Sequence, residues 1–87
     1  MRTIYKYKLE VKSEQIICTP RGARILSLQV QDSTPCLWVE VDPNAEGVDR
    51  DIYMYGTGHP IAVEHRGATF LGTVQIDGFV WHYFMVT

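Results

Sequence analysis

The alternation of apolar and polar side chains across residues 23–42 constrains the fold more than any other feature of the chain. Apolar residues occupy every second position in two runs, which are Leu26, Leu28 and Val30, and then Leu37, Val39 and Val41. A period of two is typical of a β-strand that buries one face. The two runs are separated by the turn-forming residues 32–35, so we expect them to form an antiparallel hairpin.

The same pattern extends over most of the remaining sequence. We expect further strands at residues 3–11, 15–19, 50–55, 61–63, 68–76 and 79–86, with Phe70, Val74 and Ile76 on one face of the penultimate strand. Asp77 and Gly78 form a two-residue signal for a type I′ turn between the last two strands. No segment keeps the 3.6-residue period of a helix. The sequence therefore predicts a single all-β domain over residues 1–87, a small antiparallel barrel or sandwich of six to eight short strands.

Composition narrows the classes of partner. The formal net charge is −2, whereas proteins that bind duplex nucleic acid are usually basic, so we expect no duplex partner. No apolar stretch is long enough for a membrane span and no signal peptide is recognisable, so we expect no membrane and a cytoplasmic location. Cys18 and Cys36 are expected to be buried free thiols. The histidine and cysteine spacings match no zinc pattern, and we expect neither a metal nor a cofactor.

The last expected strand, residues 79–86, is apolar on both of its faces. Both faces of such a strand must be covered. The core can cover one face, and in so small a protein a second subunit is a natural cover for the other. We therefore expect a homo-oligomer.

A glycine-rich corner follows the strand at residues 50–55. It consists of Gly56, Thr57, Gly58 and His59, and Pro60 closes it. Glycine allows positive φ and close approach of another group, so the corner gathers a hydroxyl, an imidazole and uncovered N–H groups. It can receive a phosphate or carboxylate, or it can be an ordinary sharp turn. Thr57 and His59 are too close in sequence to align as nucleophile and base, and we expect no catalytic residues and no enzymatic activity.

Aromatic and arginine side chains supply a second hypothesis. Tyr5, Tyr7 and Tyr55 are amphipathic rings on which nucleobases can stack. Arginine, at position 21, 24, 50 or 66, could hold phosphates in a bidentate manner. The alternative is that these rings fill the core or a subunit interface, where tyrosine is common.

Four segments also carry a resemblance to known proteins: TIYKY at residues 3–7, PRGARILSLQVQ at 20–31, LWVEVDP at 37–43 and YGTGHPI at 55–61. Together they resemble a family of short tailed-phage proteins that is similar to the anti-CBASS sponges. The resemblance implies a phage protein in the host cytoplasm, which sequesters a cyclic dinucleotide such as 3′,3′-cGAMP as an oligomer, without cleaving it.

On physical grounds we expect the bases of such a ligand on Tyr5, Tyr7 or Tyr55. Its phosphates would lie on the backbone of residues 56–58, assisted by Thr57, His59 and Arg24. The alternative function is a phage module that inhibits a host protein by binding it. A third, a phosphodiesterase, would release a linear product.

Overall fold

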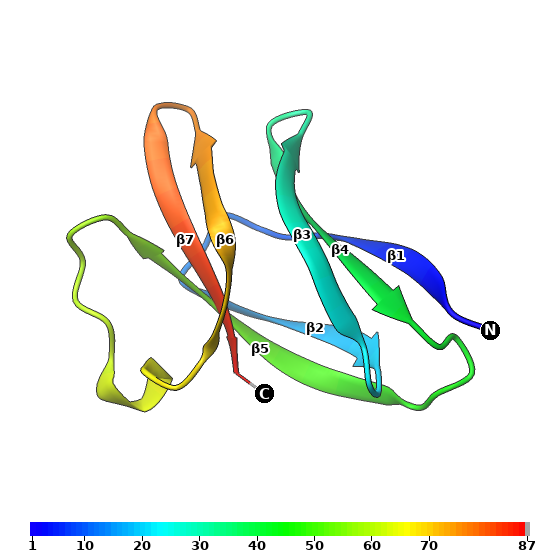
Figure 1. Cartoon of the computed structure of the whole chain (residues 1–87). Coiled ribbons are helices and arrows are strands. Elements are labelled where there is room, and N and C mark those ends of the chain that lie inside the picture. Colours follow the sequence, from blue (N-terminus) through cyan, green and yellow to red (C-terminus); the bar gives the residue numbers. More distant parts are fainter. Residues whose placement is uncertain (87) are drawn as a thin grey trace.

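The computed structural model describes residues 1–86, and strands make up most of them (Figure 1). The elements in chain order are β1 (Thr3–Lys8), β2 (Glu14–Pro20), β3 (Arg24–Gln31), β4 (Thr34–Val41), β5 (Gly47–Gly56), the 3₁₀ turn η1 (Val63–His65), β6 (Thr69–Ile76) and β7 (Phe79–Val86). The prediction of an all-β fold with six to eight short strands is confirmed.

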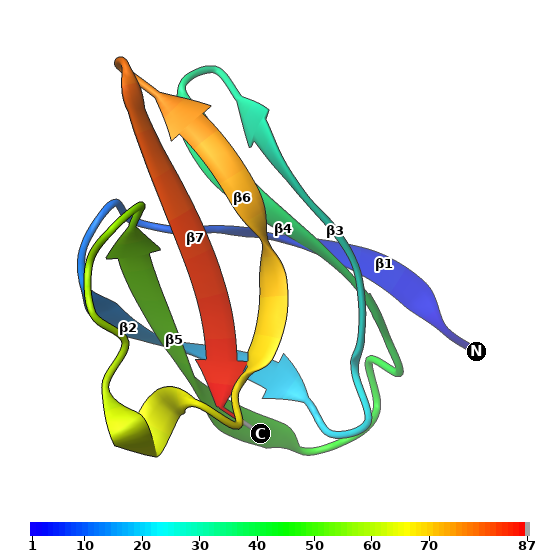
Figure 2. The ribbon, with the colours of Figure 1, turned by 60° about the vertical axis from the view of Figure 1, so that its left-hand side comes forward.

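The strands form two antiparallel sheets. One has three strands in the order β1-β4-β3, and the other has four in the order β2-β5-β7-β6. Strands β3 and β6 lie beside each other at the junction of the two sheets, as both views of the ribbon show (Figures 1 and 2). The core is packed between the sheets, so the fold is a sandwich.

Two tight hairpins set the register of the sheets. The β3–β4 turn has positive φ at Asp32 (53°) and Ser33 (62°), and the β6–β7 turn has it at Asp77 (52°) and Gly78 (82°). Positive φ at both central residues is the type I′ geometry, whose twist matches that of the flanking strands. Both predicted hairpins are therefore confirmed.

The inward faces of the central strands supply the core. Leu37, Val39 and Val41 of β4 are fully buried, as predicted, and Ile52 of β5 and Tyr83 of β7 join them from the other sheet. The Tyr83 hydroxyl donates a hydrogen bond to the Glu10 carbonyl at 2.9 Å. Burial raises the pKa of Tyr83 to about 12, because the phenolate would lose its hydration there.

Two β-bulges change the faces that simple alternation predicts. The pairing shifts between Ile25 and Ser27 in β3, and between Phe70 and Gly72 in β6. A bulge inserts one residue, so the side chains before it lie on the opposite face from that expected. The predicted inward positions of Leu26 and Phe70 are therefore wrong, and these side chains are 41% and 55% exposed.

Three smaller predictions are also corrected. Residues 61–63 form no strand, because the chain there leads from Pro60 into η1 and has no strand partner. Val30, expected inward, is 41% exposed, and it lies beside the β3–β4 turn, where it pairs with Pro35. Cys36 is buried but Cys18 is exposed on the edge strand β2, and both thiols are free.

Within residues 1–86 no helix is long and apolar enough to cross a membrane.

Candidate functional site

The outer face of the four-stranded sheet, which points away from the core, carries two rows of side chains across its strands. Register places Tyr53, Phe84 and Phe70 in one row. It places Tyr55, His82 and Thr73 in the next row. The Phe84 ring lies 5.3 Å from that of Phe70 and 6.0 Å from that of Tyr55, as measured between centroids. Most of this face is therefore aromatic.

The glycine corner closes one end of this face. Strand β5 ends at Gly56, and the His59 N–H donates to the Gly56 carbonyl at 3.1 Å, which makes residues 56–59 a β-turn. Gly58 has φ of +88°, the conformation that the third position of a type II turn needs. The His59 ring folds back, and its Nδ1 accepts a hydrogen bond from the Gly56 N–H at 3.2 Å.

Two backbone amides at the corner remain available. Within residues 1–86, the N–H groups of Thr57 and Gly58 donate to no protein acceptor. Successive uncovered amides in a turn can hold an anion. The corner therefore keeps the donor capacity that its sequence predicts.

The segment after the turn folds back over the aromatic face. The His65 ring stacks on Tyr53 with centroids 3.5 Å apart, and its Nδ1 is hydrogen-bonded to the Tyr55 hydroxyl. That hydroxyl also accepts a hydrogen bond from the Ala62 N–H at 3.4 Å. These contacts hold the segment against β5.

His82 lies between two threonine hydroxyls. Its Nε2 is 2.8 Å from Thr57 Oγ1, and its Nδ1 is 2.8 Å from Thr73 Oγ1. Sequence reasoning considered this histidine only as a metal ligand and did not connect it with the corner. The signal was the alternation in β7, which puts His82 on the face opposite the buried Tyr83.

The corner and the aromatic face enclose an open hollow of about 230 Å³. Its lining consists of Tyr55, Gly56, Thr57, Gly58, His59, Ile61, Phe70, His82 and Phe84. None of these side chains is Asp, Glu, Lys or Arg. A neighbouring hollow of about 440 Å³ shares Ile61 and Phe84, and Arg66 is among its other lining residues.

A third hollow, of about 370 Å³, has the opposite character. It lies beside Tyr53 and is lined by Glu14 and Asp51. Burial raises the pKa of Tyr53, and the Asp51 and Glu14 carboxylates raise it further. The two carboxylates therefore make this hollow unfavourable for an anion. Within residues 1–86, no group of three metal-ligating side chains converges.

The structure divides the predicted site residues into two groups. Tyr55, Gly56, Thr57, Gly58 and His59 line the same hollow. Tyr5 and Tyr7 belong to β1 of the other sheet, with their ring centroids 6.4 Å apart. In both views β1 lies on the side of the molecule away from the tip of β5 (Figures 1 and 2).

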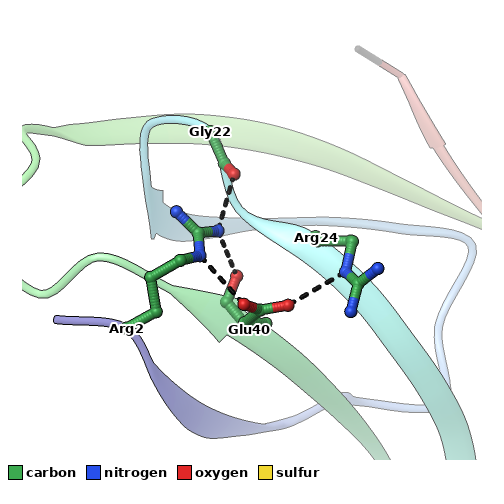
Figure 3. A network of polar contacts seen from close by, with 4 residues as sticks. All are labelled: Arg2, Gly22, Arg24 and Glu40. Carbon is green, nitrogen blue, oxygen red and sulfur yellow. Dashed lines mark hydrogen bonds and ion pairs between the residues drawn. The ribbon is translucent and has the colours of Figure 1, made fainter.

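Arg24 takes part in a separate network of ion pairs (Figure 3). Its Nε is 2.9 Å from Glu40 Oε1, and the Nε of Arg2 is 3.0 Å from Glu40 Oε2. Arg2 also donates to the Gly22 carbonyl at 3.1 Å. The hydrogen bond from Arg2 and the charge of Arg24 lower the pKa of Glu40. Arg24 thus ties β3 to β4, whereas Arg66 lines the hollow that neighbours the one at the corner.

The fold and the site define a small β-sandwich with an aromatic hollow on the outer face of one sheet, and this hollow is lined by no carboxylate, lysine or arginine. The family model of a domain of unknown function, DUF7352, matches residues 1–87, and the chain belongs to this family. Neither the curated proteins nor the solved structures contain a match to the chain.

Proposed function

We propose that this protein is a phage-encoded anti-defence protein that binds a cyclic dinucleotide of the 3′,3′-cGAMP kind in the host cytoplasm and sequesters it uncleaved. One observation carries the proposal: the hollow combines aromatic rings with uncovered backbone donors, and no carboxylate lines it. A nucleotide needs both features, because its bases stack and its phosphates accept hydrogen bonds.

The hollow offers separate places for the two parts of such a ligand. Phe84 and Phe70 present ring surface to a base, and stacking of this kind contributes about 1–3 kcal/mol per base. The amides of Thr57 and Gly58 are donors for a phosphate. Arg66 can form a bidentate pair with a second phosphate at the rim.

The size of the hollow supports an oligomer. Pockets that bury a drug-sized ligand have volumes of about 300–1,000 Å³, whereas this one has about 230 Å³. The apolar rim is also exposed, with Phe70 at 55% and Ile61 at 45% in the lining of this hollow and Val63 at 77% in that of the neighbouring one. In our proposal a second copy covers this rim and completes the enclosure of a ligand that has two bases.

The test is a thermal-shift panel of cyclic dinucleotides and trinucleotides on the purified protein, with heat-released ligand analysed by chromatography. For a protein that sequesters a nucleotide, one ligand should raise the free energy of unfolding, by an amount that grows with the logarithm of the ligand concentration divided by Kd. Heating should then release that ligand intact. A flat panel would remove the proposal. Recovery of a linear product would replace it with a phosphodiesterase.

The exposed rim also supports a second candidate, a phage module that inhibits a host protein. An apolar patch of Ile61, Val63 and Phe70 beside a hollow of about 440 Å³ suits a protein partner. Such a module would be indifferent to every nucleotide, and a host protein would be retained on the immobilised chain. Retention should then be lost with Val63→Asp, because a charge replaces the most exposed apolar side chain of the patch.

A further inference from the structure

We propose that Thr57, His82 and Thr73 form a binding site for an oxyanion, the phosphodiester group, and that this site depends on protonation of His82. We call it the seat. The inference rests on the proposed function in placing a phosphate of the cyclic dinucleotide at this seat. It adds the group that fixes the phosphate, which is a histidine on β7, the strand that pairs directly with β5 in the sheet.

Geometry links the three side chains into one hydrogen-bonded chain. Both ring nitrogens of His82 lie 2.8 Å from a threonine oxygen, Thr57 on one side and Thr73 on the other. Thr57 lines the hollow directly, next to its own uncovered amide and that of Gly58. The Thr57 hydroxyl is therefore placed to reach the same anion as the two amides.

The protonation state of His82 decides what the Thr57 hydroxyl can do. A neutral imidazole has one N–H and one lone pair. When the lone pair is on Nε2, the Thr57 hydroxyl donates to it and has no hydrogen left for a ligand. When Nε2 carries hydrogen, Thr57 accepts from the ring and its own hydrogen can point into the hollow.

Protonation of the ring removes the unfavourable arrangement altogether. Both nitrogens of the imidazolium donate, so Thr57 and Thr73 both become acceptors from the ring. The Thr57 hydrogen is then free for the anion, and a positive charge stands directly behind it. Thr73 matters because it holds Nδ1, and so it orients the ring toward Thr57.

The residues around His82 are compatible with a bound anion. From β5, the titratable group that faces His82 is Tyr55, and from the turn it is His59. From β6 the cross-strand neighbour is the uncharged Thr73, and no carboxylate lines the hollow. An anion therefore meets no repulsion there, although the chain as a whole carries a net charge of −2.

The experiment measures anion binding as a function of pH, with inorganic phosphate, pyrophosphate and a simple phosphodiester as probes. Nitrogen-15 NMR of the imidazoles shows whether each probe shifts the protonation of His82. Because binding takes up a proton, affinity should fall by up to about tenfold for each unit of rising pH within the range where histidine titrates. The same slope is expected for a cyclic dinucleotide identified by the thermal-shift panel.

Variants separate His82 from its neighbours. His82→Gln keeps hydrogen bonds to both threonines but cannot take up a proton, so the slope should disappear. Thr73→Val preserves shape but frees Nδ1, and it should weaken binding while the slope persists. His59→Gln is the matched control, because it removes the other histidine of the hollow and should leave the slope in place.

The outcomes distinguish this inference from the proposed function. An anion-dependent change in the protonation of His82, together with a pH slope of binding that is lost in His82→Gln, supports the seat, even if no cyclic dinucleotide binds and the proposed function fails. A cyclic dinucleotide that binds with no pH slope, or with a slope that persists in His82→Gln, overturns the seat and leaves the sponge standing. Probes that leave the His82 imidazole unchanged also overturn it.

Discussion

Replacing Gly56 with alanine tests how the corner is built, because two opposing effects meet at this position. A Cβ atom there would lie 2.8 Å from Cε1 and 2.9 Å from Nδ1 of His59, and 3.2 Å from the Trp81 ring. Distances below 3.0 Å are not tolerated, so the His59 ring must swing out of its place. Strand β5 can keep its path, because Gly56 does not have positive φ.

The magnitude follows from the hydrogen bond that is lost. When the ring leaves, the buried N–H of Gly56 loses its contact to Nδ1, and an unsatisfied buried donor costs about 1–3 kcal/mol. Replacement of glycine by alanine also stabilises the fold by about 0.4–1 kcal/mol, because it reduces the conformational entropy of the unfolded chain. We expect net destabilisation of about 1 kcal/mol, which lowers Tm by about 4–8 °C in a domain of this size.

The assay is thermal unfolding followed by circular dichroism, with two controls from the same segment. At Gly67 an added Cβ meets nothing within 4 Å and φ is not positive, so Gly67→Ala should raise Tm slightly. At Gly58 the space is also open but φ is +88°, so Gly58→Ala measures backbone strain alone. A Gly56→Ala protein as stable as Gly67→Ala would refute the reasoning, since the His59 ring would then contribute nothing.

Three further predictions concern other parts of the molecule. Tyr83→Phe should lower the free energy of unfolding by about 1 kcal/mol in urea, because it removes the bond to Glu10. The raised pKa of Tyr83 shows that the fold favours the neutral phenol. Its contribution to the free energy of unfolding is therefore complete below pH 10.0 and should be lost as the pH rises towards 12. The absorbance of tyrosinate measures this titration. Because the pKa of Glu40 is lowered in the folded protein, its ion pairs stabilise the fold above about pH 4.5, and this stabilisation is lost in acid. Glu40→Gln should therefore weaken the acid dependence of Tm. An unchanged fall of Tm in acid would contradict the ion-pair network. Phe84→Ala should weaken cyclic dinucleotide binding by about 5- to 150-fold in calorimetry, whereas Tyr5→Ala on β1 should not.

The fold was largely predictable because local signals agree with it. Alternation marked the seven strands, and the dipeptide Asp77-Gly78 specified its hairpin. The errors at Leu26 and Phe70 have a physical cause, since a bulge shifts the face of a strand without changing its apolar content. One of the two bulges has a signal in the sequence, because a glycine inside a strand, here Gly72, is a common sign of a bulge.

The site was predictable only where it is local in sequence. Residues 55–59 are contiguous, so their composition alone pointed to a corner with free donors. The contribution of His82 depends on the strand order β5-β7-β6, which places Thr57 and Thr73 on either side of it. Sequence periodicity says which face a residue is on, but it does not say which strands are neighbours. The same limit explains why Arg24 was grouped with the corner and Arg66 was not singled out.

The connection between β5 and β6 has an evolutionary consequence. It links two parallel strands that flank β7, so it runs from one end of the sheet to the other and carries His59, Ile61 and Arg66 on its way. Most of its side chains are exposed, and none of residues 57–68 belongs to the buried core. Substitutions and changes of length in this loop can therefore accumulate without loss of the sandwich. Loop exchange between members of the family should therefore leave the sandwich intact while it changes the lining of both hollows.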